Sequence, residues 1–92
     1  MIKSFRCRET EALFNGKTAA RFANIAAVAM RRLAILNRTG RIDDLRVPPG
    51  NRLEALKGTR ASQYSIRINR QWHICFKFRN GDAFEVEIAD YH

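Results

Sequence analysis

The feature that most constrains the fold is the alternation of apolar and polar residues towards the end of the chain. Three segments alternate in this way, at residues 64–69, 72–78 and 84–88. Their shared apolar side carries Tyr64, Ile66, Ile68, Trp72, Ile74, Phe76, Phe78, Phe84, Val86 and Ile88. A period of two among aromatic and branched residues is typical of strands with one buried face. We therefore predict three strands that turn the same kind of face towards a core.

Short connections predict that the three strands form an antiparallel meander. Residues 70–71 link the first two strands, and Asn80, Gly81 and Asp82 link the second to the third. Asn and Gly accept the positive φ angles that tight hairpins need. The other side of the strands, which we call the polar face, carries Ser65, Arg67, Asn69, His73, Cys75 and Lys77. The apolar face needs a cover, whereas the polar face is open to a ligand or to water.

The first half of the chain supplies elements that could cover the apolar face. Residues 1–7 read as a strand, and residues 9–14 as a short helix that ends at Asn15 and Gly16. Thr18 is a candidate N-cap for a longer helix over residues 19–36. Its apolar stripe is Phe22, Ile25, Ala26, Ala29, Leu33 and Leu36, at spacings of three and four. We expect one α+β domain over residues 1–92.

The segment at 43–56 is expected to be irregular. Pro48 and Pro49 each lack an amide donor and cannot continue a helix. The side chains expected to hold this segment against the body are Leu45, Val47, Leu53 and Leu56.

The charge of the chain favours a polyanionic partner. Seventeen Lys and Arg residues stand against nine Asp and Glu residues, so the formal net charge is +8 and the pI is about 10.5. Such a field attracts nucleic acid or an acidic protein. Arginine dominates the basic set, and its guanidinium binds phosphate at two points. A basic domain without such a partner is the alternative.

Several classes of protein are not indicated. Cys7 and Cys75 lie far apart without other Cys or His at ligand spacing, so we expect reduced cysteines, no metal site and no cofactor. The residues after Met1 do not read as a signal peptide, and no apolar run reaches membrane-spanning length. We therefore expect a cytoplasmic protein with no membrane partner.

Candidate chemistry lies on or beside the polar face. The basic residues there are Lys57, Arg60, Arg67, Arg70, His73 and Lys77. His73 and His92 are the two histidines, and histidine changes protonation near neutrality, which suits proton transfer. The alternatives are a solvated basic surface, a docking site for an acidic protein, and a frayed chain end at residues 90–92.

Segments along the whole chain resemble the HigB toxins of bacterial type II toxin–antitoxin systems, in the RelE/ParE superfamily. The segments that carry the resemblance are MIKSF at 1–5, RLEALKG at 52–58, YSIRIN at 64–69, QWHICF at 71–76 and VEIADYH at 86–92. The resemblance implies a RelE-like, microbial-RNase-like antiparallel sheet with two N-terminal helices packed on one face. It also implies a metal-independent endoribonuclease that needs the 70S ribosome and cleaves translated mRNA.

The resemblance also implies partners and site residues. A HigA antitoxin with a helix-turn-helix domain would neutralise the toxin, which would contact operator DNA only through that antitoxin. The catalytic residues carried over are Lys57, Arg67, His73, Asp90, Tyr91 and His92. Residues expected to bind messenger or ribosomal RNA are Arg31, Arg32, Arg38, Arg60, Arg70 and Lys77.

The chain departs from the family pattern at two positions. His73 stands where relatives usually carry an arginine that is expected to contact the scissile phosphate, and Glu54 stands where some relatives carry a histidine. A histidine lacks the guanidinium fork and is only partly charged at neutral pH. The alternatives are therefore a catalytically weakened, RNA-binding homologue and a ParE-like toxin that inhibits DNA gyrase.

Overall fold

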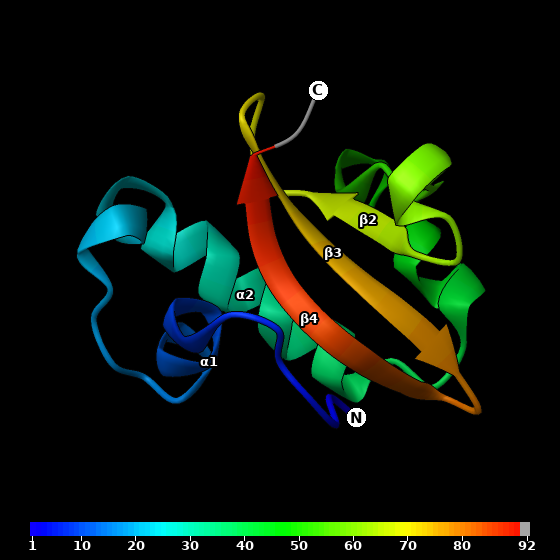
Figure 1. The fold of residues 1–92 in the computed structure, drawn as a ribbon, viewed down its shortest axis with the longest axis horizontal. Helices are drawn as coiled ribbons and strands as arrows, with labels where there is room; N and C mark the ends of the chain where they lie inside the picture. The colour runs from blue at the N-terminus through cyan, green and yellow to red at the C-terminus, as the bar shows by residue number, and fades with distance from the viewer. Residues whose placement is uncertain (91–92) are drawn as a thin grey trace.

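The computed structural model describes residues 1–90, and its centre is a four-stranded antiparallel sheet in the order β1-β2-β3-β4 (Figure 1). The strands are β1 (Glu54–Ala55), β2 (Tyr64–Arg67), β3 (Trp72–Arg79) and β4 (Asp82–Asp90). The predicted meander is confirmed in β2, β3 and β4. The short strand β1 is an addition, because residues 43–56 were expected to be irregular throughout.

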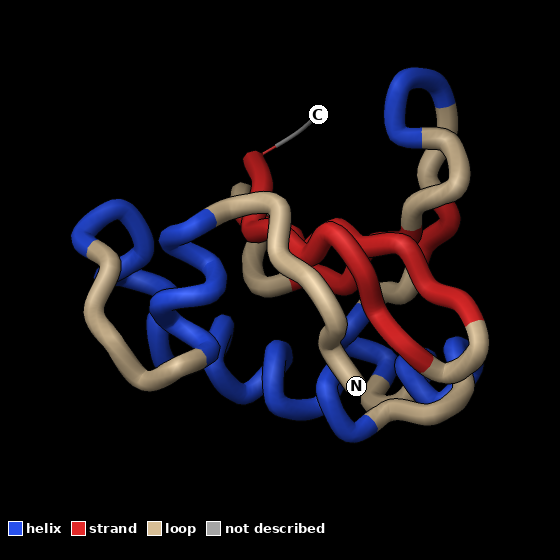
Figure 2. Tube along the Cα trace, turned by 60° about the horizontal axis from the view of Figure 1, so that its bottom comes forward, coloured by secondary structure: helices blue, strands red, loops and turns tan. Residues whose placement is uncertain are grey.

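Helices cover the apolar face of this sheet, and the two layers are visible in Figure 2. They are α1 (Arg8–Phe14), the 3-10 helix η1 (Ala20–Ile25) and α2 (Ala26–Arg38). Ala29, Leu33 and Leu36 of α2 are fully buried in the same core as strand residues such as Ile66 and Ile74. The α+β, RelE-like fold class is therefore confirmed, and the polar face is the side of the sheet without α2.

The long helix predicted over 19–36 is not continuous. Its first part is the 3-10 helix η1, where Phe22 has non-helical angles of φ −111° and ψ 16°. The predicted Thr18 N-cap is wrong, since Ala19 takes that position and makes no side-chain capping bond. Phe22 is fully buried, with its ring 5.2 Å from that of Trp72 in an edge-to-face arrangement. We infer that this tertiary contact overrides the local helical pattern.

The N-terminal segment lies along β4 but is less regular than the strand predicted at 1–7. It forms two isolated parallel bridges, Ile2 with Ala83 and Phe5 with Val86. Regular pairing is interrupted next to a β-bulge, where Glu85 takes a left-handed φ of 52°. The Glu85 amide there donates to the hydroxyl of Ser4 at 2.8 Å.

The connection between α2 and the sheet contains the 3-10 helices η2 (Ile42–Arg46), η3 (Pro49–Asn51) and η4 (Gly58–Arg60). Leu45 is fully buried as predicted, but Val47 is 72% exposed, so its predicted anchoring role is wrong. Instead, the buried Asn51 side chain donates to the carbonyl oxygens of Leu45 and Val47 at 3.1 and 3.3 Å.

No helix within residues 1–90 is long and apolar enough to cross a membrane.

Candidate functional site

The strand register brings two predicted site residues together. Arg67 on β2 lies directly opposite His73 on β3, and His73 lies opposite Ala89 on β4. Directly opposed residues in an antiparallel pair point to the same face, with Cβ atoms about 4.5–5.5 Å apart. Arg67 and His73 are therefore neighbours on the polar face.

Backbone contacts hold the strand segment that carries Arg67. The Arg67 Nε donates to the carbonyl oxygen of Asn69 at 3.1 Å. From the helical layer, the Arg32 Nε donates to the carbonyl oxygen of Arg67 at 3.3 Å. Arg32, which was predicted to bind RNA, therefore also links α2 to the strand that carries Arg67.

The turn between β2 and β3 contacts the end of β4. The Asn69 Oδ1 accepts hydrogen bonds from the amides of Gln71 and Trp72 at 2.8 and 2.7 Å, which fixes the turn. The Gln71 side-chain amide donates to the Asp90 carboxylate at 3.1 Å. Asp90 is opposite Trp72 in the register, so its side chain leaves the sheet on the opposite side from His73. Its predicted neighbours Tyr91 and His92 lie outside the described residues.

The middle of the polar face is less open than its sequence suggests. Ser65 lies opposite Cys75, which lies opposite Glu87, and both Ser65 and Cys75 are buried. Burial raises the pKa of the Cys75 thiol to about 11, with Arg60 opposing the shift and Glu87 adding to it. The Cys75 thiol is therefore protonated at neutral pH and is a poor nucleophile.

Two charged residues of this face were missed in the sequence. Glu87 of β4 has its carboxylate 3.4 Å from the Arg6 Nε and 3.9 Å from an Arg60 Nη. Glu87 could have been found, because it alternates with the apolar Val86 and Ile88. Arg6 could not, because its position depends on how the N-terminal segment packs along β4.

The remaining predicted basic residues are spread over the molecule. Lys77 is bound by Glu85 at 2.7 Å, and the Lys77 ammonium holds the pKa of this carboxyl below its usual value. Lys57 is exposed between β1 and η4, and Arg70 is exposed in the turn before β3. Arg31 and Arg38 are exposed on α2, in the helical layer. The structure therefore brings together Arg67 and His73, but not Arg31 and Arg38 with them.

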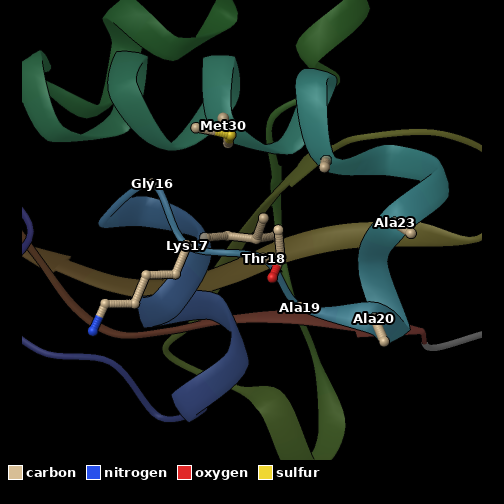
Figure 3. Close-up of a pocket in the computed structure, with 9 residues that line it drawn as sticks. Gly16, Lys17, Thr18, Ala19, Ala20, Ala23 and Met30 are labelled. Carbon is tan, nitrogen blue, oxygen red and sulfur yellow. The ribbon is translucent and has the colours of Figure 1, made fainter.

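A hollow of about 450 Å³ lies elsewhere, between the helices and the loop that joins α1 to η1 (Figure 3). It is lined by Leu13, Gly16, Lys17, Thr18, Ala19, Ala20, Ala23, Ala26 and Met30. None of the predicted site residues is among them, and the lining holds no acid–base pair. The hollow is therefore separate from the residues that were predicted to take part in acid–base chemistry. Within residues 1–90 there is also no group of three metal-ligating His, Cys, Asp or Glu side chains.

Comparison with known proteins is consistent with this arrangement. Residues 3–92 match the family described as the RelE-like toxin HigB of type II toxin–antitoxin systems. The chain is 35% identical to the Endoribonuclease HigB of Proteus vulgaris over the full length of both proteins. It is 39% identical to Toxin HigB-1 of Vibrio cholerae over 70% of this chain and 67% of that protein.

An uncharacterized protein of Haemophilus influenzae is 38% identical over 66% of this chain, and the match spans 60% of that protein. The family match covers nearly the whole chain and agrees with the observed sheet and helices. A toxin of this type implies an antitoxin partner. The chain belongs to the family of RelE-like HigB toxins of type II toxin–antitoxin systems.

Proposed function

We propose that this chain is an endoribonuclease that cleaves mRNA on the 70S ribosome during translation. The observation that carries the proposal is the juxtaposition of Arg67 and His73 on the polar face. The full-length similarity to a protein named Endoribonuclease HigB supports it. A guanidinium beside an imidazole combines a fixed positive charge with a group that exchanges protons near neutrality.

The chemistry we propose is attack of a ribose 2′-oxygen on the adjacent phosphorus. The 2′-oxygen loses its proton, the new P–O bond forms, and the 5′-oxygen leaves and gains a proton. A catalyst must move both protons and stabilise the negative charge on the phosphoryl oxygens. Arg67 and Lys57 are assigned to charge stabilisation, with His73 assisting them. This reaction needs no cofactor.

The end of the chain is assigned to proton transfer and to orientation of the RNA. His92 and Asp90 are the candidates for moving protons or orienting the 2′-hydroxyl, and Tyr91 is a candidate for stacking on a base. The contact between Gln71 and Asp90 ties the start of this segment to the β2–β3 turn, next to the strand that carries His73.

The ribosome is proposed as the setting because the basic residues are not confined to one face. Arg31, Arg32 and Arg38 belong to α2, while Arg60, Arg70 and Lys77 belong to the sheet and its connections. A strand of mRNA that lies on the polar face leaves the α2 set for other phosphates. Ribosomal RNA that surrounds a bound protein can supply the phosphates for the second set.

The antitoxin is proposed to be a HigA-type protein with a helix-turn-helix domain. The toxin would then reach operator DNA only through the antitoxin, and both proteins would act in the cytoplasm. Growth arrest on induction of the chain, and its relief by co-expression of the neighbouring reading frame, would support this pairing. Arrest that persists with that antitoxin present contradicts it.

Mapping of mRNA 5′ ends by primer extension after brief induction tests the proposed activity. We expect new ends within translated codons, and we expect them to be lost in Arg67→Ala. Arg21→Ala is the matched control, because Arg21 is paired with Glu9 at 3.2 Å in the helical layer. Intact mRNA together with DNA damage would instead indicate a gyrase inhibitor, and intact mRNA without damage would indicate an RNA-binding homologue that does not cleave.

A further inference from the structure

Three charged side chains from separate segments meet at one edge of the polar face. Glu87 lies on β4, Arg6 on the N-terminal segment that runs along β4, and Arg60 at the end of η4. The Glu87 carboxylate is 3.4 Å from the Arg6 Nε and 3.9 Å from the Arg60 Nη1. We call these three residues the Glu87 cluster. The assignment of Arg67 and His73 to catalysis does not use this cluster.

We propose that Arg6 and Arg60, held together by Glu87, bind the RNA phosphate next to the one that is cleaved at Arg67 and His73. This inference rests on the proposed function, since it concerns the same RNA strand. Glu87 acts as a positioning residue, while the two arginines contact the RNA.

The register sets the spacing between the two phosphate sites. Glu87 lies opposite Cys75, and Cys75 lies two residues from His73 along β3. Because His73 pairs with Ala89, Glu87 is the diagonal neighbour of His73 on β4, at a separation of about 7–8 Å. This is close to the separation of successive phosphates along an RNA strand. An RNA strand that follows β3 therefore presents its next phosphate to the Glu87 cluster.

Arg6 retains groups that bind phosphate, while the Arg60 Nη1 also donates to the side-chain oxygen of Gln63 at 3.2 Å. A guanidinium has five N–H donors, and Arg6 contacts Glu87 through Nε, so the donors on its two Nη atoms remain for another ligand. The Arg6 side chain is 56% exposed, which allows a ligand to reach it. The cluster keeps a net charge of +1, since two arginines face one carboxylate.

The position of Glu87 explains why an acidic residue stands on a surface that would bind RNA. Two guanidinium groups repel each other, and a carboxylate between them holds both in place. The Glu87 side chain is 18% exposed, and its negative charge is offset by the two arginines that it contacts. The alternative is a purely structural role, in which the ion pairs tie the N-terminal segment and η4 to the sheet.

Replacing Glu87 distinguishes the positioning role from the purely structural role, because the two roles predict different changes in RNA affinity. Glu87→Gln raises the net charge by one, and electrostatics alone predicts tighter RNA binding. Our inference predicts weaker binding, by about 3- to 10-fold, because the arginines lose the group that positions them. The measurement is fluorescence anisotropy of a short labelled single-stranded RNA, titrated at several salt concentrations. Arg6→Ala and Arg60→Ala should each reduce the slope of log K against log salt by about 0.7.

Matched variants control for charge and for folding. Glu9→Gln makes the same charge change and breaks the pair between Glu9 and Arg21 in the helical layer, so RNA affinity should stay constant or rise slightly. Arg6→Lys keeps the positive charge but removes the two-point binding of the guanidinium. RNA affinity should therefore fall, while the slope of log K against log salt stays at its wild-type value. This milder variant keeps the test valid if Glu87→Gln does not fold, which circular dichroism would reveal.

Each outcome decides for or against the inference. Weaker binding by Glu87→Gln, with reduced slopes for both arginine variants, supports it. Unchanged or tighter binding by Glu87→Gln, with wild-type slopes for Arg6→Ala and Arg60→Ala, overturns it and leaves the structural role. A wild-type protein that binds RNA but does not cleave mRNA contradicts the proposed function without affecting this comparison.

Discussion

His73 occupies the middle of the polar face, between Arg67 on β2 and Ala89 on β4. In our proposal the scissile phosphate lies beside Arg67 and His73, which are opposite each other in the register. The Nδ1 atom of His73 is buried. The arginine that relatives usually carry at this position would supply a permanent charge and two donors at the same point.

We predict that His73→Arg cleaves ribosome-bound mRNA faster than the wild type. The gain should grow from pH 6 to pH 8, because an ordinary imidazole loses its charge around pH 6.5 whereas a guanidinium keeps it. Single-turnover cleavage measured across this range tests the prediction. His73→Ala is the companion variant, and wild-type rates in both variants would remove His73 from the mechanism.

We predict that the buried thiol of Cys75 makes the protein less stable at alkaline pH. Its thiol has a pKa of about 11 in the folded protein and about 9.0 in the unfolded chain, so the folded state holds the proton more tightly. This contribution to stability is complete below pH 9 and is lost as the pH rises from about 9 to about 11. The loss should be about 1–2 kcal/mol. Urea denaturation at several pH values measures this loss of stability. The Cys75→Ala variant should lose correspondingly less stability over the same pH range. An equal loss in the variant and the wild type would contradict the assignment of the effect to Cys75.

At the scale of elements, β3 joins the core to the candidate site. Ile74 and Phe76 are fully buried on its apolar face, while His73 between β2 and β4 belongs to the other face. The same strand therefore packs into the core on one side and carries the proposed site on the other. Substitutions on the two sides should separate these roles.

We predict that Ile74→Ala lowers the free energy of unfolding by about 2–5 kcal/mol, because it leaves a cavity in the core. Chemical denaturation measures the change. Ile74→Val should cost about 0.5–1.5 kcal/mol, which keeps the test informative if the alanine variant is unfolded. Val47→Ala is the surface control, since Val47 is 72% exposed, and its effect should stay within about 0.5 kcal/mol. A denaturation midpoint for Ile74→Ala equal to that of the control would contradict the observed burial.

The whole molecule consists of a helical layer and a sheet, and only the sheet's polar face carries the paired Arg67 and His73. Binding of a partner and cleavage of RNA can therefore depend on different parts of the chain. The end of β4, where Asp90 contacts Gln71, leads directly to the terminal residues assigned to chemistry.

We predict that deletion of Tyr91 and His92 abolishes mRNA cleavage and leaves a folded protein that binds its antitoxin. Neither residue falls in the alternating core pattern, yet both belong to the motif that carries the family resemblance. Cleavage mapping and co-purification with the antitoxin measure the two properties separately. Gln71→Ala is the accompanying variant and should reduce cleavage partially, since it removes the hydrogen bond to Asp90. Full cleavage by the truncated, folded chain would exclude the tail from the mechanism.

Alternation predicted β2, β3 and β4 and placed Arg67 and His73 on one face. It was wrong for Phe84, which was predicted on the apolar side but lies opposite Lys77 beyond a register shift. Side chains in a strand alternate with a period of two whatever the strand packs against. The stripe of Ala29, Leu33 and Leu36 predicted the buried side of α2 for the same kind of local reason. The family match extended the prediction from single elements to the whole fold, because it covers residues 3–92.

Other features depended on contacts between distant segments. The break between η1 and α2 accompanies the packing of Phe22 against Trp72, which a helical pattern cannot reveal. Cys75 reads as part of an open polar face, yet it is buried. The Glu87 cluster exists because the N-terminal segment and η4 both return to β4. Local periodicity in the sequence predicts the face of an element on which a side chain lies. The packing of distant segments determines what covers that side chain and which charges it meets.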